Sequence, residues 1–409
     1  MRLLCVSRSF WPLASPGAVL LRDRLAALAR LGVEVTVFAA RWDASWNDEA
    51  VIDGIFIRRL GDPAVGRQSH DRFDRVLAEK LRAEARKYDV LLASGAGRDG
   101  EVALRVEPVV RVPLVLCFDR PGPLGDGIAA GRWRMAKRKR ERSERVAKAL
   151  VTNPASYRDA LAAGVEPSRI RSIPFAAGAP SASAGAVPSS AGAVAAAGEM
   201  RTERGPSPGG NPPPSTNRRA VARESLAEGQ HALRLGHPGK AVAYLGSLYD
   251  PHRIAEFVRI VARQVDDYPS LRFWIVGDGP HSASIRRAAD RAGISDTIEL
   301  LGEFDAWDDV AAAADVVVIP SPAEPFSYAA LAAVHAGTPA LVAKSDAYDA
   351  LGEGAIQIDT LEEAAWSEAL SRLLAERRIV PPGIVPSHDE AAIRTLQQLA
   401  TLPSPIRLA

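Results

Sequence analysis

Cysteine and aromatic residues are scarce in this chain of 409 residues, which contains two cysteines and 6% aromatic residues. Cys5 and Cys117 both lie inside strand-like apolar runs. We expect two buried, reduced thiols, because disulfides belong mainly to secreted proteins. The seven histidines are scattered and neither cysteine has a partner at ligand spacing, so the sequence predicts no metal site.

Long apolar runs and an excess of one charge are also missing. Arg8 interrupts the apolar start before it reaches signal-peptide length, and no later run reaches about 18 apolar residues. We therefore expect a cytoplasmic protein with no membrane-spanning segment. The net charge of +2 argues against a protein that mainly binds nucleic acid, and no nucleic-acid module is recognisable.

What the sequence does contain is an alternation of strand-like and helix-like segments. Residues 2–7 read as a strand, 20–31 show helical spacing, and 33–40 read as a second strand. Strands that alternate with helices pair in parallel, because the connection must cross over the sheet. Strand candidates continue at 55–60, 90–94, 113–118, 149–153 and 170–174.

The composition divides the chain into four parts. A first domain is expected at residues 1–175, and a linker or insertion rich in Ala, Gly, Pro and Ser follows at 176–235. A second alternating series predicts another domain at 236–380, before a C-terminal tail at 381–409. The expected fold class is α/β, with two doubly wound, Rossmann-like domains whose strand carboxyl ends face each other across a ligand-binding cleft.

Two stretches of the second domain lie at that expected edge. Gly277, Asp278 and Gly279 form a tight turn after a buried strand. The stretch "PSPAEPFSYAALAAVHAGTPALVA", residues 320–343, runs from a loop into a helix and a further strand. Amide groups at a helix N-terminus attract phosphate and sugar oxygens. Two interpretations of Glu324 stay open here: an acceptor for sugar hydroxyls, or an acid that stabilises the helix dipole.

In these motifs the chain resembles the retaining family 4 glycosyltransferases, which have the GT-B fold. The resemblance rests on "GDGP" at 277–280, "LGE" at 301–303, "ADVVVIPSPAEPFS" at 314–327 and "AGTP" at 336–339, and more loosely on "SFWPLASPGA" at 9–18. It implies transfer of a hexose from a nucleotide sugar, with retained configuration and no metal or other cofactor. Its members keep two doubly wound domains around the donor.

The resemblance also implies roles for individual residues. Glu324 would contact the donor hexose, and Gly17 would lie beside the diphosphate. Asp119, which follows a strand of the first domain, would handle the acceptor, although an acid there is also ordinary turn chemistry. The remaining donor-binding candidates are Gly277, Asp278, Gly279, Ser321, Phe326, Ser327, Arg253 and His252.

Four positions depart from the family pattern. The acid expected eight residues after Glu324 is Ala332, and the expected basic pair is replaced by Ser247 and His252. Ser327 stands where glycine is customary. These departures favour an alternative function, a non-catalytic relative that acts as a binding or scaffold protein. A nicotinamide-dependent oxidoreductase is a further alternative, but no G-x-G-x-x-G turn follows the first strand.

Partners follow from the same resemblance. We expect a nucleotide-sugar donor and a glycan or lipid-linked acceptor, in cell-surface polysaccharide or glycoconjugate synthesis. The basic run at residues 132–148 suits an anionic membrane surface, which would place the protein at the inner face of the membrane. A solvated helix face is the alternative for this run, and His335 is expected to be a packed helix residue.

Overall fold

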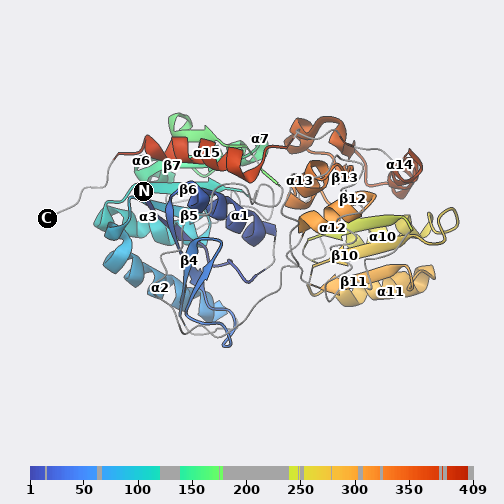
Figure 1. Ribbon diagram of the computed structural model, residues 1–409, viewed down its shortest axis with the longest axis horizontal. Coiled ribbons are helices and arrows are strands. Elements are labelled where there is room, and N and C mark those ends of the chain that lie inside the picture. Colours follow the sequence, from blue (N-terminus) through green and yellow to red (C-terminus); the bar gives the residue numbers. More distant parts are fainter. Residues whose placement is uncertain are drawn as a thin grey trace.

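Two largely parallel sheets, each covered by helices, make up the computed structural model (Figure 1). It describes residues 1–13, 16–61, 67–119, 139–174, 176–177, 239–246, 248, 253–277, 279–302, 307–322, 326–376, 380 and 385–403.

The first sheet has the strand order β3-β4-β2-β1-β5-β6-β7-β8, and only β3 runs antiparallel to its neighbour. Its inner strands are almost entirely buried and apolar, as parallel strands covered on both faces require. The strands are β1 (Arg2–Val6), β2 (Glu34–Ala40), β3 (Glu49–Ile52), β4 (Ile55–Leu60), β5 (Val90–Ser94), β6 (Leu114–Phe118), β7 (Val146–Val151) and β8 (Ile170–Ser172).

Helices cover both faces of this sheet, and one apolar cluster fills each side. Cys5 and Cys117 are free and buried there, as the sequence predicts. The helical segments are α1 (Pro16–Arg30), α2 (Arg67–Glu84), η1 (Ala85–Lys87), α3 (Arg98–Val110), α6 (Lys139–Arg145), α7 (Pro154–Ala162) and η2 (Pro167–Arg169).

The second sheet is fully parallel, with the order β11-β10-β9-β12-β13-β14. Its strands are β9 (Ala241–Leu245), β10 (Arg272–Val276), β11 (Ile298–Gly302), β12 (Val316–Ile319), β13 (Ala340–Ala343) and β14 (Ala355–Ile358). The helices are α10 (Ile254–Ala262), α11 (Ser282–Ala292), α12 (Trp307–Ala313), α13 (Tyr328–His335), η4 (Asp346–Gly354) and α14 (Glu363–Glu376), followed by α15 (His388–Ala400).

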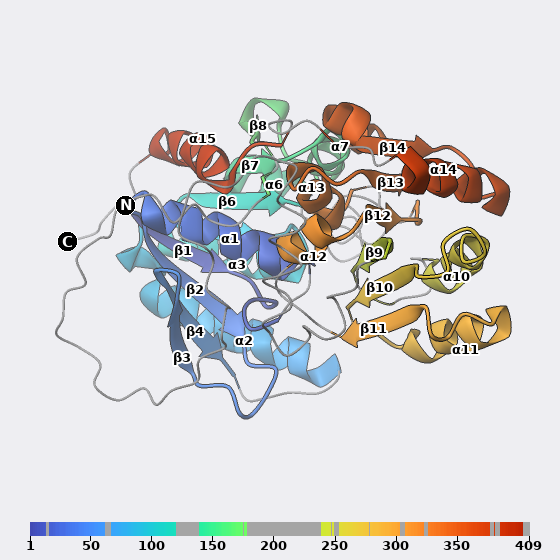
Figure 2. The ribbon, with the colours of Figure 1, turned by 45° about the vertical axis from the view of Figure 1, so that its right-hand side comes forward.

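The carboxyl ends of the two sheets point towards each other. In Figure 2 the arrow of β6 points towards the second domain, and the arrows of β10 and β11 point towards the first. This arrangement confirms the predicted α/β fold with two Rossmann-like domains. Among the residues that the structure describes, no helix is both long and apolar enough to span a bilayer.

Helix α15 belongs spatially to the first domain, although it follows the second domain in the chain (Figure 1). Ala392 and Leu399 join the apolar cluster that covers the α1 face of the first sheet. Ser387 caps the helix through a reciprocal contact with Glu390. The segment expected as a C-terminal tail therefore contains a helix that completes the core of the first domain.

The first residue of α15, His388, is buried, with 3% of its surface exposed. Burial lowers the pKa of His388 to about 3, and the positive charges of Arg24 and Arg30 act in the same direction, as does His335. The neighbouring carboxylate of Asp389 raises this pKa, but by less than burial and the positive charges lower it. The imidazole is therefore neutral in the folded protein at neutral pH.

This burial predicts a loss of stability in mild acid. The unfolded chain binds a proton at His388 below pH 6.5, whereas the folded protein excludes it down to about pH 3. The free energy of unfolding therefore decreases by about 1.4 kcal/mol per pH unit as the pH falls below 6.5, and this contribution is absent above that pH. We expect His388→Gln to lose less stability than the wild type between pH 6.5 and 4.5 in urea titrations. Parallel losses in the two proteins would contradict the assignment.

Candidate functional site

The site predicted at the sheet edges gathers around the first turns of α1 and α13. Gly17 lies in the first turn of α1 and is partly exposed. Ser327 is the N-cap of α13, where its Oγ accepts a hydrogen bond from the amide of Ala329 at 3.3 Å. The two helices, one from each domain, are in contact.

Ser321 and Phe326 bound the segment that contains Glu324. Ser321 is 1% exposed after β12, and the ring of Phe326 stacks on Tyr348 at 5.4 Å between centroids. Ser327 adopts an extended conformation that any residue can take, so the serine needs no glycine-like backbone. Glu324, Asp278 and His252 lie outside the described residues.

Gly277 and Gly279 are required by close backbone packing. Gly277 has φ +140°, and a Cβ there would lie 1.8 Å from the carbonyl oxygen of Gly246. A Cβ on Gly279 would lie 2.4 Å from the carbonyl oxygen of Leu248. The loops after β9 and β10 therefore cross backbone to backbone, and this crossing shapes the edge of the second sheet.

Arg253 is the N-cap of α10 and has a left-handed backbone, with φ 57°. Its Nε donates to Glu256, and its Nη2 donates to the carbonyl oxygen of Leu361 at 3.3 Å. A small pocket between the starts of α10 and α11 is lined by Arg253, Glu256 and His281, among others. The guanidinium thus forms its hydrogen bonds with residues of the second domain.

Asp119 follows β6 and is tied to α1. Its Oδ2 and Oδ1 accept hydrogen bonds from the two terminal nitrogens of Arg24, at 2.9 and 3.0 Å. The Arg24 side chain is 4% exposed and that of Asp119 is 12% exposed. This nearly buried, bidentate pair fixes α1 against the end of β6.

The basic run predicted at residues 132–148 is described only from Lys139. Within that part, Arg142 is 2% exposed, and its Nη1 donates to the carbonyl oxygen of Ala163 at 2.9 Å. Arg145 pairs with Glu141 one helical turn away. The membrane interpretation therefore depends on residues 132–138, outside the described residues, more than on these arginines.

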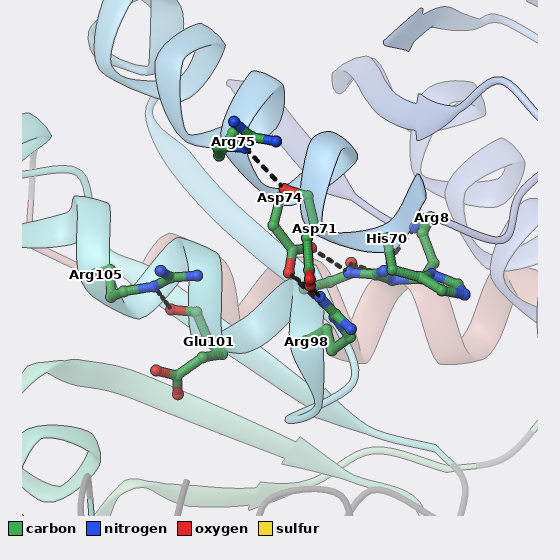
Figure 3. Close-up of polar contacts among 9 residues, drawn as sticks. Arg8, His70, Asp71, Asp74, Arg75, Arg98, Glu101 and Arg105 are labelled. Atoms are coloured by element: carbon green, nitrogen blue, oxygen red, sulfur yellow. Dashed lines mark hydrogen bonds and ion pairs between the residues drawn. The ribbon is translucent and has the colours of Figure 1, made fainter. Parts of the chain in front are cut away.

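A polar cluster at the edge of the first sheet was not predicted (Figure 3). We call it the Arg8 cluster; its members are Arg8, His70, Asp71, Asp74, Arg98 and Asp99. The guanidinium of Arg8 binds Asp99 at 2.7 Å and Asp74 at 2.8 Å, and the backbone amide of Arg8 donates to Asp99. Arg98 binds Asp74 at 2.7 Å. These bonds join the loop after β1 to α2 and to the first turn of α3.

His70 accepts a hydrogen bond within this cluster. Nη1 of Arg8 lies 3.0 Å from Nδ1 of His70, and a guanidinium can only donate, so Nδ1 accepts and the ring proton is on Nε2. Partial burial lowers the pKa of His70, and Arg8 and Arg98 lower it further. The rings of His70 and Trp42 make a T-shaped contact, with 5.6 Å between centroids, and Nε1 of Trp42 donates to the carbonyl oxygen of Arg8 at 2.7 Å.

One sequence signal could have identified the Arg8 cluster. Arg8 follows β1 by two residues, and Arg98 and Asp99 begin the helix after β5. β1 and β5 are neighbours in the sheet, so polar residues just beyond their carboxyl ends are brought together. The contribution of α2 depends on the packing of a helix whose start lies far from β1 in sequence.

Both domains match known families. Residues 17–176 match a model described as Glycosyltransferase Family 4, and residues 239–376 match one described as Glycosyl transferases group 1. The two matched segments lie on the two sheets and together cover most of the chain.

The chain belongs to the GT-B glycosyltransferases. Curated relatives of this GT-B chain match parts of it. The D-inositol 3-phosphate glycosyltransferase of Corynebacterium urealyticum is 28% identical over 175 residues, which are 39% of this chain and 41% of that protein. The 2-deoxystreptamine N-acetyl-D-glucosaminyltransferase of Streptomyces fradiae is 32% identical over 125 residues, 30% of each protein. The matched regions span between 16% and 41% of the curated relatives' length.

Solved structures share the GT-B fold over nearly the whole chain. Anabaena HepE in complex with UDP and glucose superposes with a TM-score of 0.68 and 14% identity, covering 98% of this chain and all of that one. WaaG, a glycosyltransferase of lipopolysaccharide biosynthesis, superposes with a TM-score of 0.59 and 13% identity, covering 98% and 95% of the two chains. At these identities the likeness concerns the fold.

The glycine crossing generates a paired prediction. Gly277→Ala should destabilise the protein by more than about 3 kcal/mol, because the added methyl meets a backbone carbonyl that cannot move aside. Gly302→Ala is the control, since its φ of +73° is unfavourable but no atom lies within 4 Å of the new Cβ, so about 1 kcal/mol is expected. Urea unfolding followed by circular dichroism measures both. Similar losses in the two variants would show that the close approach is unimportant.

The Arg8 cluster generates a second paired prediction. Arg8→Met leaves the nearly buried carboxylates of Asp74 and Asp99 without their shared cation, and should cost about 3 kcal/mol of stability. Arg105→Met removes an exposed arginine that donates only to a backbone carbonyl on its own helix, and should cost less than about 0.5 kcal/mol. Denaturation midpoints compare the two variants. An unchanged midpoint in Arg8→Met would assign the cluster no part in stability.

Proposed function

We propose that the chain transfers a hexose from a nucleotide sugar to a glycan or lipid-linked acceptor, with retention of anomeric configuration. The reaction would serve the synthesis of cell-surface polysaccharide or another glycoconjugate. The observation that carries this proposal is the contact between α1 and α13, one helix from each of two domains that match glycosyltransferase models.

The contact gives the proposed donor two sets of amide groups. The first turn of α1, with Gly17, and the first turn of α13, after Ser327, present N–H groups of the kind that bind anions. Negative charge develops on the diphosphate as the glycosidic bond breaks, and fixed dipoles at that position lower the barrier. The nucleoside would lie on the second domain, with the diphosphate between the domains. The proposal includes no metal or other cofactor.

Glu324 is the proposed contact of the donor hexose, where its carboxylate would accept hydrogen bonds from sugar hydroxyls. Buried residues on both sides of its segment, Ser321 and Phe326, hold the two ends of that segment in place. Asp119 is the weaker candidate for the catalytic role, because both of its oxygens already bind Arg24.

Names of similar proteins support a UDP-sugar as the first donor to test. The Anabaena structure holds UDP and glucose, and another structure of the same protein holds UDP-glucose. The curated relatives act on different acceptors by their names, an inositol phosphate and 2-deoxystreptamine. The acceptor class of this chain, a glycan or a lipid-linked molecule, thus rests on the family resemblance alone. Peripheral attachment to the inner membrane face rests on the basic run at residues 132–148.

A non-catalytic binding or scaffold protein is the second candidate. Ala332, which replaces the family's second acid, is fully buried within α13. Arg253, the nearest described cation to the missing basic pair, is engaged by Glu256 and Leu361. These two observations favour weaker binding of a nucleotide-sugar donor, or slower transfer from it, than in an active enzyme of the family.

A panel of nucleotide sugars, screened by thermal shift, tests the proposal. We expect one donor to raise the melting temperature, because a ligand at 100 times its Kd stabilises the folded state by about 2.7 kcal/mol. Glu324→Ala should remove most of this shift, and His335→Ala should retain it. The stereochemistry of the product, read by NMR of the anomeric proton, tests retention.

The controls separate the two candidate functions. Equal losses in Glu324→Ala and His335→Ala would remove Glu324 from the site. No response to any donor at millimolar concentration, from protein that unfolds cooperatively, would favour the binding or scaffold protein. Sugar transfer with retention would exclude that alternative.

A further inference from the structure

A buried polar contact joins the two domains next to the proposed donor site. The phenol oxygen of Tyr328, the first residue of α13, lies 3.4 Å from Oδ2 of Asp23 on α1 and 3.4 Å from Nε2 of His388 on α15. Each of these three residues is less than 5% exposed. We call this group the domain junction.

The chemistry of the junction gives each bond a direction. Burial, with the Asp308 and Asp23 carboxylates, raises the pKa of Tyr328 well above its usual value, so the phenol stays protonated and donates to Asp23. In its neutral form His388 donates from Nε2 to the phenol oxygen when the ring proton is on that nitrogen. The other carboxylate oxygen of Asp23 accepts from Nε of Arg22 at 2.9 Å.

The position of the junction connects both halves of the proposed site. Tyr328 directly follows Ser327, the N-cap of α13, and Asp23 lies on α1, whose first turn contains Gly17. Val19 and Leu20 of α1 belong to the same apolar cluster as Trp307 and Phe326 of the second domain. Apolar packing alone lets helices slide, whereas a hydrogen bond to a buried carboxylate fixes one relative position.

We propose that Asp23, Tyr328 and His388 are positioning residues that set the distance between the first turns of α1 and α13, and thereby the affinity for a diphosphate held between them. This inference rests on the proposed function for its ligand. The residues act through the two helix starts and do not touch the donor themselves.

Tyr328→Phe in the full chain tests the proposal, because it keeps the ring that packs on Trp307 and removes only the hydroxyl. The probes are uridine, which would contact only the second domain, and UDP, whose diphosphate would span both. By calorimetry we expect the Kd for UDP to rise about tenfold and the Kd for uridine to stay within twofold. Asp23→Asn should act similarly, and the double variant should add little.

Arg158→Gln is the control for interdomain contacts in general. It removes the ion pair between Arg158 of α7 and Asp346 of η4, whose side chains are 58% and 43% exposed. Exposed pairs contribute little, so this variant should bind UDP like the wild type. Equal weakening of uridine and UDP binding in Tyr328→Phe, or no change in either, would overturn the proposal.

A second measurement keeps the test independent of the donor. Spin labels on Ser168→Cys and Arg286→Cys, both exposed, report the distance between the domains, while the two native cysteines are buried. We expect one narrow distance distribution in the otherwise unchanged protein and a broader or longer one with Tyr328→Phe. If neither probe binds but the distribution broadens, the proposed donor is wrong and the junction stands; an unchanged distribution refutes the junction.

Discussion

The burial of α1 between the two domains is the constraint on which the remaining structure depends. One face of this helix covers the first sheet, another contacts α13 of the second domain, and a third carries α15. A helix enclosed in this way leaves little room for charged residues, yet Arg22, Asp23 and Arg24 are all buried in it. Each of these charges therefore needs a partner within reach. The partners come from the residue that follows β6, from α13 and from the neighbouring residue of α1.

Several residues expected to bind the donor or the acceptor also have a structural role. Gly277 and Gly279 stand in the motif that resembles a donor site, but each also permits a backbone crossing that a side chain would block. Asp119 occupies a position expected to contact the acceptor, and it also holds α1 in place by accepting two hydrogen bonds from Arg24. A motif residue can be needed for the fold and can also contact a ligand. Its presence in the sequence therefore does not show which of these two roles it has.

Much of the fold could be predicted from the sequence because it depends on local periodicity. The strands at 55–60 and 90–94 were expected within the observed bounds of β4 and β5, and the fold class followed from their alternation with helices. The docking of α15 on α1 and the meeting of Arg8 with Asp74 could not be predicted, since both join residues far apart in sequence through helix packing. The site was predictable as a sheet edge; the polar partners of Asp23 and Asp119 were decided by tertiary contacts.

The path of the chain has a consequence for how the protein is made. The chain leaves the first domain after Ala177, builds the second sheet, and returns with α15, so the second domain is inserted into the first. During synthesis the apolar face that receives Ala392 and Leu399 remains uncovered until the second domain has been translated. The second domain can therefore fold before the first has received its last helix.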